Sequence, residues 1–400
     1  YKIMNKYLNN INASYCCGCS ACVHKCPKQC LRMSQDKDGF FFPIVNNREA
    51  CIDCSLCAKV CPMENMVESD YPHTFYGAYN TNKTDIVNSS SGGIYPSLAK
   101  WIISQGGIVF GASLDDEHKL YHIGVSTESD IQKTIGSKYF QSEIRDTYVE
   151  CKKELDKGRL VLYTGTPCQV HGLKRYLGKD YDNLYTADVI CHGVPSSKMF
   201  DAYIDFLEKK HNGKLVDINF RDKKRNGWSI TLRYTIEYSN DKRKDYYLIN
   251  KLSEYFMAFL GGYIERESCY SCPFSSMRRP GDITMGDFWG YQFKRPDLKH
   301  DEGLSLIIVN SEHGKRIVDV LHRNGVQFNA VDEECVKASE NKNLYKPTLR
   351  PEVRSVVYDE LQNFGFEYIA KKYFRRTQTL RNKAKNYMPV ALVNIIKKLK

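Results

Sequence analysis

The sequence lacks any long apolar run. No stretch approaches the length of a membrane-spanning helix, and residues 1–12 contain no apolar core like that of a secretory signal. These absences argue against an integral membrane protein and against export. In a reducing cytoplasm, 16 cysteines are expected to bind metal rather than to form disulfides. We therefore expect a cytoplasmic protein with metal-bound cysteines.

Acidic residues are in the minority, with 47 Asp and Glu against 58 Lys and Arg, so the formal net charge is +11. This count treats the cysteines as neutral, whereas each thiolate-bound cubane carries on the order of two negative charges. No base-stacking motif accompanies the basic residues, which are concentrated late in the chain. We expect no nucleic-acid partner. The basic amphipathic stretch 390–400 fits either a helix packed on its own domain or contact with a membrane surface or a partner.

Two cysteine runs of identical spacing lie in the first 62 residues. Each reads C-x2-C-x2-C-x3-C-P, the ferredoxin run in which the fourth cysteine ligates the other cluster. The predicted ligands of two [4Fe-4S] clusters are Cys16, Cys19, Cys22 and Cys61 for one, and Cys51, Cys54, Cys57 and Cys26 for the other. The alternative is a zinc-ribbon or disulfide module, but zinc sites normally take four ligands in two C-x2-C pairs. Cys17 and Cys30 fall outside the pattern, and we interpret them as packing or stray thiols.

The length of 400 residues favours two or three domains. We predict a dicluster ferredoxin-like domain over 13–66, a larger mixed-sheet α/β domain over 74–335 and a basic helical C-terminal extension over 336–400, with a linker at 67–73. In the larger domain, the patterns predict helices over 94–104, 143–157, 169–177, 197–210 and 312–322. They predict strands over 108–112, 120–126, 159–163, 184–190, 216–220, 229–238, 304–309 and 327–331.

Four further cysteines form a second constellation. Cys168 and Cys191 follow two neighbouring predicted strands, at the edge where α/β sheets bind ligands, and Cys269 and Cys272 form a C-x2-C pair on a later loop. A third [4Fe-4S] cluster, a zinc ion and free thiols all remain open. The cluster is favoured because electrons from a ferredoxin module need a relay into the main domain.

Two polar loops are candidates for binding a cofactor. The first, Ser89, Ser90, Ser91, Gly92 and Gly93, directly precedes the predicted helix 94–104, so its backbone N–H groups suit a diphosphate, although such a loop is also ordinary helix capping. The second comprises residues 136–142, with Gly136, Ser137, Lys138, Tyr139, Gln141 and Ser142. It offers hydroxyls, a cation and an aromatic face, but a lone segment of this kind is also typical of a surface loop.

These motifs together resemble one known family. The dicluster run is followed in order by SSSGGIYPSLAKWII, GSKYFQS, YTGTPCQVHGLKRYL, VICHGVPSSKMF, INFRDKKRNGWS and CYSCPFSSMRRPGDITMGDFWG. The series resembles the coenzyme F420 hydrogenase/dehydrogenase beta-subunit family over roughly residues 13–335. The resemblance implies an iron–sulfur flavoprotein that binds FAD.

The resemblance also assigns roles to residues. It implies FAD contacts at 89–93 and 136–142, and cluster ligation by Cys168, Cys191, Cys269 and Cys272. It places Asp287, in the stretch 286–290, near the flavin, although Phe288 and Trp289 also fit plain core aromatics.

The expected function is passage of electrons between [4Fe-4S] clusters and FAD, with hydride exchange on an organic substrate. The expected donor is a soluble ferredoxin or another low-potential carrier. Lys138 is a candidate for assisting charge at the flavin and His192 for donating a proton, although a histidine beside a metal ligand also serves as a structural hydrogen-bond partner. Two alternatives remain: an electron-transfer subunit that uses deazaflavin coenzyme inside a larger complex, and a non-catalytic protein with structural clusters.

Overall fold

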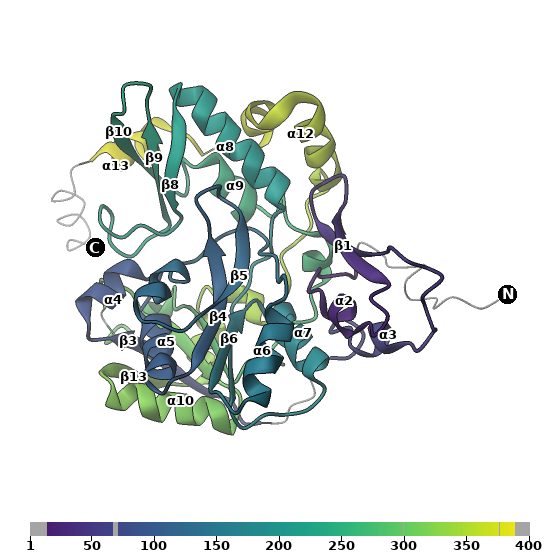
Figure 1. The fold of residues 1–400 in the computed structure, drawn as a ribbon. Coiled ribbons are helices and arrows are strands. Elements are labelled where there is room, and N and C mark those ends of the chain that lie inside the picture. The colour runs from purple at the N-terminus through teal and green to yellow at the C-terminus, as the bar shows by residue number, and fades with distance from the viewer. Residues whose placement is uncertain (1–13, 67–70, 299, 376, 389–400) are drawn as a thin grey trace.

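The computed structural model describes residues 14–66, 71–298, 300–375 and 377–388. The predictions for residues 1–12 and 390–400, and for most of the linker, lie outside these ranges. A small N-terminal module lies beside a larger domain (Figure 1). None of the helices in the described part of the chain is long and apolar enough to cross a bilayer.

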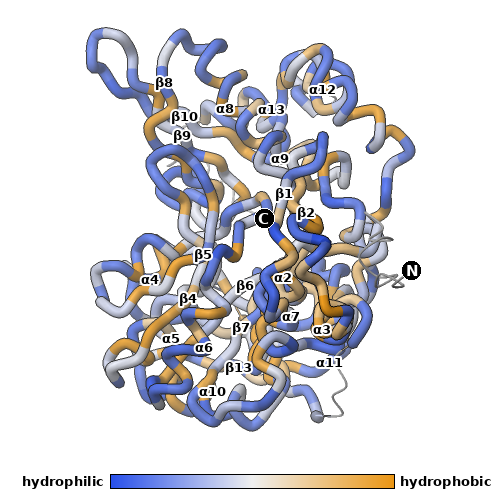
Figure 2. The backbone as a smooth tube through the Cα atoms, turned by 45° about the vertical axis from the view of Figure 1, so that its right-hand side comes forward, coloured by the Kyte–Doolittle hydropathy of each residue, from blue (hydrophilic) through white to orange (hydrophobic). Residues whose placement is uncertain are grey.

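The N-terminal module consists of two short helices and one hairpin. Helices α2 (Ala21–Lys25) and α3 (Leu56–Lys59) each follow the second cysteine of a run, and strands β1 (Leu31–Gln35) and β2 (Phe41–Val45) pair antiparallel. In Figure 2 the module lies beside α6 (Thr147–Asp156) and α7 (Pro167–Leu177). Because apolar residues from both sides form one buried cluster there, the module is packed onto the larger domain.

The larger domain is built on one mixed sheet of eight strands in the order β13-β3-β12-β11-β7-β6-β4-β5. Its strands are β3 (Thr74–Asn80), β4 (Ile108–Leu114), β5 (Leu120–Val125), β6 (Val161–Gly165), β7 (Leu184–Val189), β11 (Ile283–Asp287), β12 (Ser305–Val309) and β13 (Val326–Val331). The four strands β4, β6, β7 and β11 run parallel, and the outer strands pair antiparallel. The predicted mixed-sheet α/β class is confirmed.

Helices cover both faces of this sheet. On β6, Val161 and Tyr163 join the apolar cluster under α6 and α7, whereas Leu162 joins the cluster under α5 (Ile94–Ser104) and α10 (Glu312–Arg323). This alternation follows from the two-residue period of a strand. A short helix, α4 (Lys83–Asn88), connects β3 to the serine and glycine loop before α5.

A second layer of structure carries a three-stranded antiparallel sheet in the order β10-β9-β8. Strands β8 (Lys214–Asn219), β9 (Thr231–Glu237) and β10 (Arg243–Ile249) pack with helices α8 (Ser197–His211), α9 (Glu254–Leu260) and α12 (Arg354–Ile369). Apolar residues of α12 and of the segment up to Phe374 belong to this core. The described part of the predicted C-terminal extension, which also contains α11 (Glu333–Ala338) and α13 (Leu380–Tyr387), is therefore packed against the domain.

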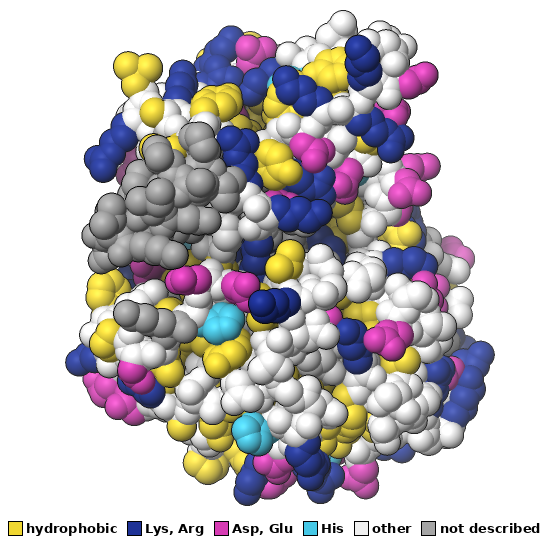
Figure 3. Space-filling view, turned by 90° about the vertical axis from the view of Figure 1, so that its left-hand side faces the viewer, with side chains coloured by type: hydrophobic (Ala, Val, Ile, Leu, Met, Phe, Trp, Pro, Cys, Tyr) yellow, Lys and Arg dark blue, Asp and Glu magenta, His cyan; other side chains and the backbone are white. Residues whose placement is uncertain are grey.

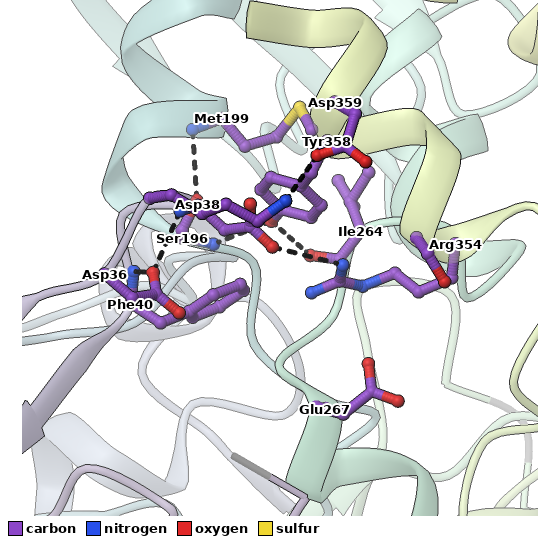
Figure 4. Close-up of polar contacts among 12 residues, drawn as sticks. Asp36, Asp38, Phe40, Ser196, Met199, Ile264, Glu267, Arg354, Tyr358 and Asp359 are labelled. Atoms are coloured by element: carbon purple, nitrogen blue, oxygen red, sulfur yellow. Dashed lines mark hydrogen bonds and ion pairs between the residues drawn. The ribbon is translucent and has the colours of Figure 1, made fainter.

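Arg354 fastens the turn between β1 and β2 to the larger domain (Figure 4). Its Nη1 lies 3.6 Å from Asp38 Oδ2, its Nε donates to the carbonyl of Glu265 at 2.9 Å, and its guanidinium lies 4.2 Å from the ring centre of Tyr358. Burial raises the pKa of Asp38, and Arg354 opposes that shift. The N-terminal module is thus held in place by a buried ionic contact as well as by apolar packing.

The predicted elements agree with the structure except at a few positions. Helix α6 begins at Thr147, later than predicted, while α7 begins at Pro167, which places Cys168 in its first turn. Strands β1, β2, β3, β10 and β11 were not predicted. Both β3 and β11 contain a glycine and few β-branched residues, so only pairing on both sides makes them strands.

Lys and Arg side chains gather in the upper part of the face shown in Figure 3, where β10 and α13 lie in Figure 1. Lys242, Arg243 and Lys244, at the start of β10, are exposed. The N-terminal module lies on the opposite side of the molecule. Part of the positive charge therefore lies on the side away from the cysteine runs.

Candidate functional site

The structure brings the eight cysteines of the two runs together as two groups of four. Cys26 lies with Cys51, Cys54 and Cys57, which we call the outer set, and Cys61 lies with Cys16, Cys19 and Cys22, which we call the inner set. The fourth cysteine of each run therefore reaches the other run. Residues of the outer set line a small cavity of about 30 Å³.

Both runs reach this arrangement through the same backbone conformations. Gly18 and Asp53 stand two residues after the first cysteine, and Ser20 and Ser55 directly follow the second; all four have φ between 50° and 69°. These left-handed residues wrap the chain so that its amides face the sulfurs, as the Gly18 N–H does toward Cys16 Sγ at 3.4 Å. Such donors suit an anionic cluster.

The four cysteines of the second constellation, which we call the third set, also lie together. Cys168 is in the first turn of α7, Cys191 follows β7, and Cys269 and Cys272 lie in and just after a 3₁₀ turn at Glu267–Ser271. Burial, reinforced by the neighbouring thiols, raises the pKa of Cys191 to about 12 and that of Cys272 to about 11. Cysteines bind a metal as thiolates, so these four thiols must lose their protons when they act as ligands. Because four crowded thiolates repel one another, a cationic centre among them is needed to stabilise the deprotonated forms.

Two buried arginines fit a negatively charged group at the third set. The first, Arg279, donates to Val189 O at 2.8 Å and to Phe274 O at 2.7 Å, which fixes the segments before Cys191 and after Cys272, and it pairs with the fully buried Asp188. Burial raises the pKa of Cys191, and the charge of Arg279 opposes that shift.

The second, Arg266, lies between the inner and third sets. Its guanidinium donates to the backbone carbonyls of Cys16 at 2.6 Å and Phe41 at 2.9 Å and to Gln141 Oε1 at 3.0 Å. The hydrogen bond with Cys17 and burial raise the pKa of Cys168, and the charge of Arg266 opposes that shift. Because its three acceptors are neutral, Arg266 retains a positive charge that suits thiolate-bound clusters on either side.

Among the described residues, no group of three or more His, Cys, Asp and Glu side chains is arranged to hold a metal ion. A zinc site requires its sulfurs to lie about 2.3 Å from one point. The third-set cysteines raise one another's pKa, so they are neighbours, and the cluster at this set stays a prediction.

A cavity of about 330 Å³ adjoins the third set. Its lining includes Cys191, His192 and Gly193 on one side and the predicted loops at 89–93 and 136–142 on the other. The predicted contact residues that line it are Ser89, Ser90, Ser91, Gly93, Gly136, Ser137, Lys138, Tyr139, Ser142 and Asp287. The volume lies within the range of small-molecule and cofactor sites.

The serine and glycine loop leaves donors available toward this cavity. Helix α5 begins after Gly93, which has φ of 76° and provides no side-chain cap, and the buried Ser89 hydroxyl has no hydrogen-bond partner. Ser90 Oγ accepts from the Ser137 N–H at 2.8 Å, so the two loops are joined. An uncapped helix N-terminus beside an unpartnered hydroxyl fits a phosphate group.

Lys138 lies in the cavity wall. Its Nζ donates to the carbonyls of Ala112 at 2.8 Å and Ile135 at 2.9 Å, and burial lowers its pKa to about 7. Because both acceptors are neutral, an anionic ligand in the cavity would provide the missing negative charge.

Two predicted contact residues do not line the cavity. Gly92 packs against the sheet, where an added Cβ would lie 2.4 Å from Ala78 O, and Gln141 faces the N-terminal module, donating to Cys17 O at 3.2 Å. Gly92 therefore shapes the loop by its close approach to β3. Gln141 instead belongs to the contact between module and domain.

Asp287 and His192 are both engaged in hydrogen bonds. The Asp287 carboxylate accepts two bonds from Arg221, at 2.6 and 3.0 Å, and one from Trp228 Nε1 at 2.8 Å. Both ring nitrogens of His192 have partners, Phe259 O at 3.1 Å and Asn343 Oδ1 at 3.3 Å, and burial lowers its pKa. These bonds favour the structural alternative for His192 and a supporting role for Asp287.

Several residues of the site were not predicted. His122, whose pKa is lowered to about 4 by burial and then by Lys138, lines the cavity together with Tyr95 and Gln169. Arg266 was missed as well. Tyr95 and Gln169 lie in motifs quoted above but were not singled out, whereas His122 and Arg266 lie outside those motifs. The Thr166–Gln169 pattern at the start of α7 is a capping box, which was readable as a helix start.

Comparison with known proteins identifies two parts of the chain. Residues 158–334 match the family described as the C terminus of "Coenzyme F420 hydrogenase/dehydrogenase, beta subunit", and residues 15–66 match "4Fe-4S dicluster domain". No curated protein matches the sequence. A solved structure titled "Xenon derivatization of the F420-reducing [NiFe] hydrogenase complex from Methanosarcina barkeri" is similar at 16% identity and a TM-score of 0.44, over 81% of this chain and 97% of that chain.

The fold and the cysteine sets define an iron–sulfur electron-transfer protein with a large α/β domain. Its N-terminal module matches the 4Fe-4S dicluster domain, and residues 158–334 of its larger domain match the C-terminal domain of coenzyme F420 hydrogenase/dehydrogenase beta subunits. The family prediction and the prediction of two N-terminal [4Fe-4S] clusters are confirmed by these matches. The third cluster, the flavin and the catalytic residues stay predictions.

Proposed function

We propose that this chain is an iron–sulfur flavoprotein oxidoreductase. In this proposal the outer, inner and third sets each hold a [4Fe-4S] cluster, and the cavity beside Cys191 holds FAD. When bound, the clusters supply one-electron transfer, and the flavin supplies two-electron hydride chemistry. The supporting observation is that Cys191 of the third set belongs to the cavity wall, so an electron carrier and a cofactor-sized site share a boundary.

The loop residues are suited to holding the diphosphate of FAD. The N-terminus of α5 and the Ser89 hydroxyl provide donors, and Lys138 provides a cation on the opposite loop. Lys223 supports the loop from behind, because its Nζ donates to Ile86 O at 2.8 Å and to Ser91 O. These contacts orient the cofactor without consuming the donors that face the cavity.

Lys138 and His192 receive different roles in this proposal. Lys138 compensates negative charge in the cavity, because the two carbonyls that accept from its ammonium are neutral. His192 holds the loop after Cys191 against Phe259 and Asn343, so it fixes the wall that separates the third set from the cavity.

Electrons are proposed to enter at the outer set. Cys54 is exposed, and the neighbouring Ile52 is 56% exposed, whereas Cys19, Cys22 and Cys61 of the inner set are buried. An exposed cysteine beside an apolar side chain fits transient contact with a protein donor such as a soluble ferredoxin. The order from donor to cavity is then outer set, inner set, third set.

The substrate class is an organic hydride acceptor or donor. The match of residues 158–334 to coenzyme F420 hydrogenase/dehydrogenase beta subunits makes deazaflavin coenzyme the first compound to test, either in a stand-alone enzyme or within a larger complex. Mixing the reduced protein with deazaflavin coenzyme and recording its absorbance tests this choice. If the reduced protein does not react with deazaflavin coenzyme, the substrate is another organic compound.

Iron and flavin content test the proposed function directly. Anaerobically purified full-length protein is expected to contain about twelve irons and one FAD per chain. Eight irons and no flavin would refute the flavoprotein proposal. Cys269→Ser is expected to remove about four irons and leave the dicluster signals unchanged, whereas Cys335→Ser, at a buried cysteine in another apolar cluster, is the control and retains them all.

A further inference from the structure

Arg221, two residues after strand β8, is buried but is not among the residues that line the cavity. Its guanidinium donates to Ser90 O at 2.9 Å and to Tyr139 Oη at 2.9 Å. It also donates to both carboxylate oxygens of Asp287, at 2.6 and 3.0 Å. All three partners line the cavity. A single side chain from outside the cavity therefore joins both polar loops to the end of β11.

Asp287 balances the charge of Arg221 and fixes its orientation. The carboxylate accepts two bonds from the guanidinium, and Trp228 Nε1 donates to the same carboxylate at 2.8 Å. Trp228 is itself stacked on Trp289, with the ring centres 3.9 Å apart. A paired, bidentate contact of this kind holds a guanidinium in one plane. Arg221 therefore acts on the cavity through the position of its donors rather than through unbalanced charge.

The bond to Ser90 O determines the direction of the next amide. The peptide between Ser90 and Ser91 is trans, so its N–H points away from the carbonyl and hence away from Arg221. Both serines line the cavity. Within the described ranges, no backbone or side-chain acceptor is bonded to the Ser91 N–H. This amide is thus available to an acceptor on a ligand.

The next carbonyl of the loop differs in this respect. Lys223 Nζ donates to Ser91 O, but the amide that follows this carbonyl, the Gly92 N–H, donates to Ser305 Oγ at 2.9 Å. That amide is therefore used within the protein. Of these two buried cations, Arg221 is the one that holds a carbonyl whose following amide has no acceptor among the described residues.

We propose that Arg221 is a positioning residue for the diphosphate of the bound cofactor. By holding Ser90 O, it directs the Ser91 N–H toward a phosphate oxygen, and by holding Tyr139 Oη it keeps the second loop opposite the first. Backbone amides of a glycine-rich loop before a helix are suited to such an anion. The proposal rests on the proposed function, because it takes the ligand of the cavity to be FAD.

The experiment compares the binding of three ligands to full-length protein stripped of flavin: FAD, ADP and riboflavin. ADP has the diphosphate without the flavin ring, and riboflavin has the ring without a phosphate. Arg221→Lys keeps a cation beside Asp287 but lacks the planar fork that reaches Ser90 and Tyr139 together. We expect this variant to bind FAD and ADP about tenfold more weakly than wild type and to bind riboflavin with unchanged affinity.

Arg233→Met is the matched control for Arg221→Met. Arg233 lies on β9 in the same layer and pairs with the buried Asp222 at 3.3 Å. Its ionic partners, which do not line the cavity, are Asp217, Asp222 and Asp245. Both methionine variants remove the cation of a buried pair, so both are expected to have a lower melting temperature. Arg221→Met is expected to lose affinity for FAD and ADP, whereas Arg233→Met should retain it.

Riboflavin affinity and iron content show whether each variant is folded. Wild-type affinity of Arg221→Lys for FAD and ADP would overturn the proposal. An equal loss for riboflavin would also overturn it, because Arg221 would then support the whole cavity rather than the diphosphate. Wild-type protein that binds ADP but neither FAD nor riboflavin would refute the flavoprotein proposal instead, and ADP binding by Arg221→Lys would still decide the role of Arg221. Binding of none of the three ligands would refute both.

Discussion

The N-terminal and third cysteine sets reach similar surroundings by opposite routes. The inner and outer sets come from two short runs that share left-handed residues at the same positions, such as Ser20 and Ser55. The third set joins the start of α7, the end of β7 and a distant 3₁₀ turn. The first kind of site therefore depends on local backbone conformation, whereas the second depends on the order of strands in the sheet.

Arg279→Met is expected to have the largest effect, because it should damage the third set and leave the two N-terminal sets intact. The substitution leaves Asp188 buried without its cation and releases Val189 and Phe274, which flank the third set. Removing one partner of a buried pair costs about 3–5 kcal/mol of unfolding free energy. We expect a lower melting temperature and loss of about four irons, with the dicluster signals retained. The control is Arg278→Met at the exposed neighbouring arginine, and equal losses in both variants would contradict the prediction.

Gly92→Ala is expected to impair the cavity and spare all three cysteine sets. The new Cβ would lie 2.4 Å from Ala78 O and 3.0 Å from Ser305, so the loop before α5 must move. We expect flavin affinity to fall about tenfold or more, with unchanged iron content, measured by flavin titration of the stripped protein. Gly106→Ala, just beyond the other end of α5, introduces strain at φ of 74° in open space and should leave flavin affinity unchanged.

Arg266→Gln tests whether charge between the inner and third sets stabilises their reduced forms. Removing this cation should lower the potentials of the adjacent centres, because added electrons would lose a favourable electrostatic interaction. A decrease of about 60 mV corresponds to a tenfold change in the one-electron equilibrium. A redox titration checks this, with the outer-set centre as the internal reference. A shift of equal size at the outer set would show a general effect instead.

The smallest expected effect is a pH dependence of flavin binding that arises from Lys138. Its pKa of about 7 means that it loses its proton as the pH rises through 7, so affinity for an anionic diphosphate should fall about tenfold between pH 6 and pH 8. Folding has the opposite sign: because the folded pKa lies below the ordinary 10.5, stability decreases as the pH falls from about 10.5 to 7.

Lys138→Met should abolish the pH dependence of flavin affinity. Lys223→Met is the matched control, because burial also lowers the pKa of Lys223 to about 7 but Lys223 is not among the residues that line the cavity. If the pH profile survives in Lys138→Met and disappears in Lys223→Met, the assignment of Lys138 is wrong.

Local patterns made much of the fold and the site predictable. The spacing of the two runs indicated both N-terminal sets, and helix α5 was predicted with its observed bounds. In contrast, β11 was missed because Gly286 and Asp287 disfavour a strand in isolation, and only pairing with β7 and β12 stabilises it. Gln141 was assigned to the cofactor because of its neighbours in sequence, yet its side chain extends toward Cys17.

The sequence by itself determined that the chain carries two ferredoxin-type clusters, because cysteine spacing and left-handed turns act within a few residues of one another. Only the tertiary structure decided that the third set meets a cavity and that Arg266 lies between two sets. Those relations join elements far apart in the chain. They depend on sheet order and on docking of the module, for which a single sequence contains no local signal.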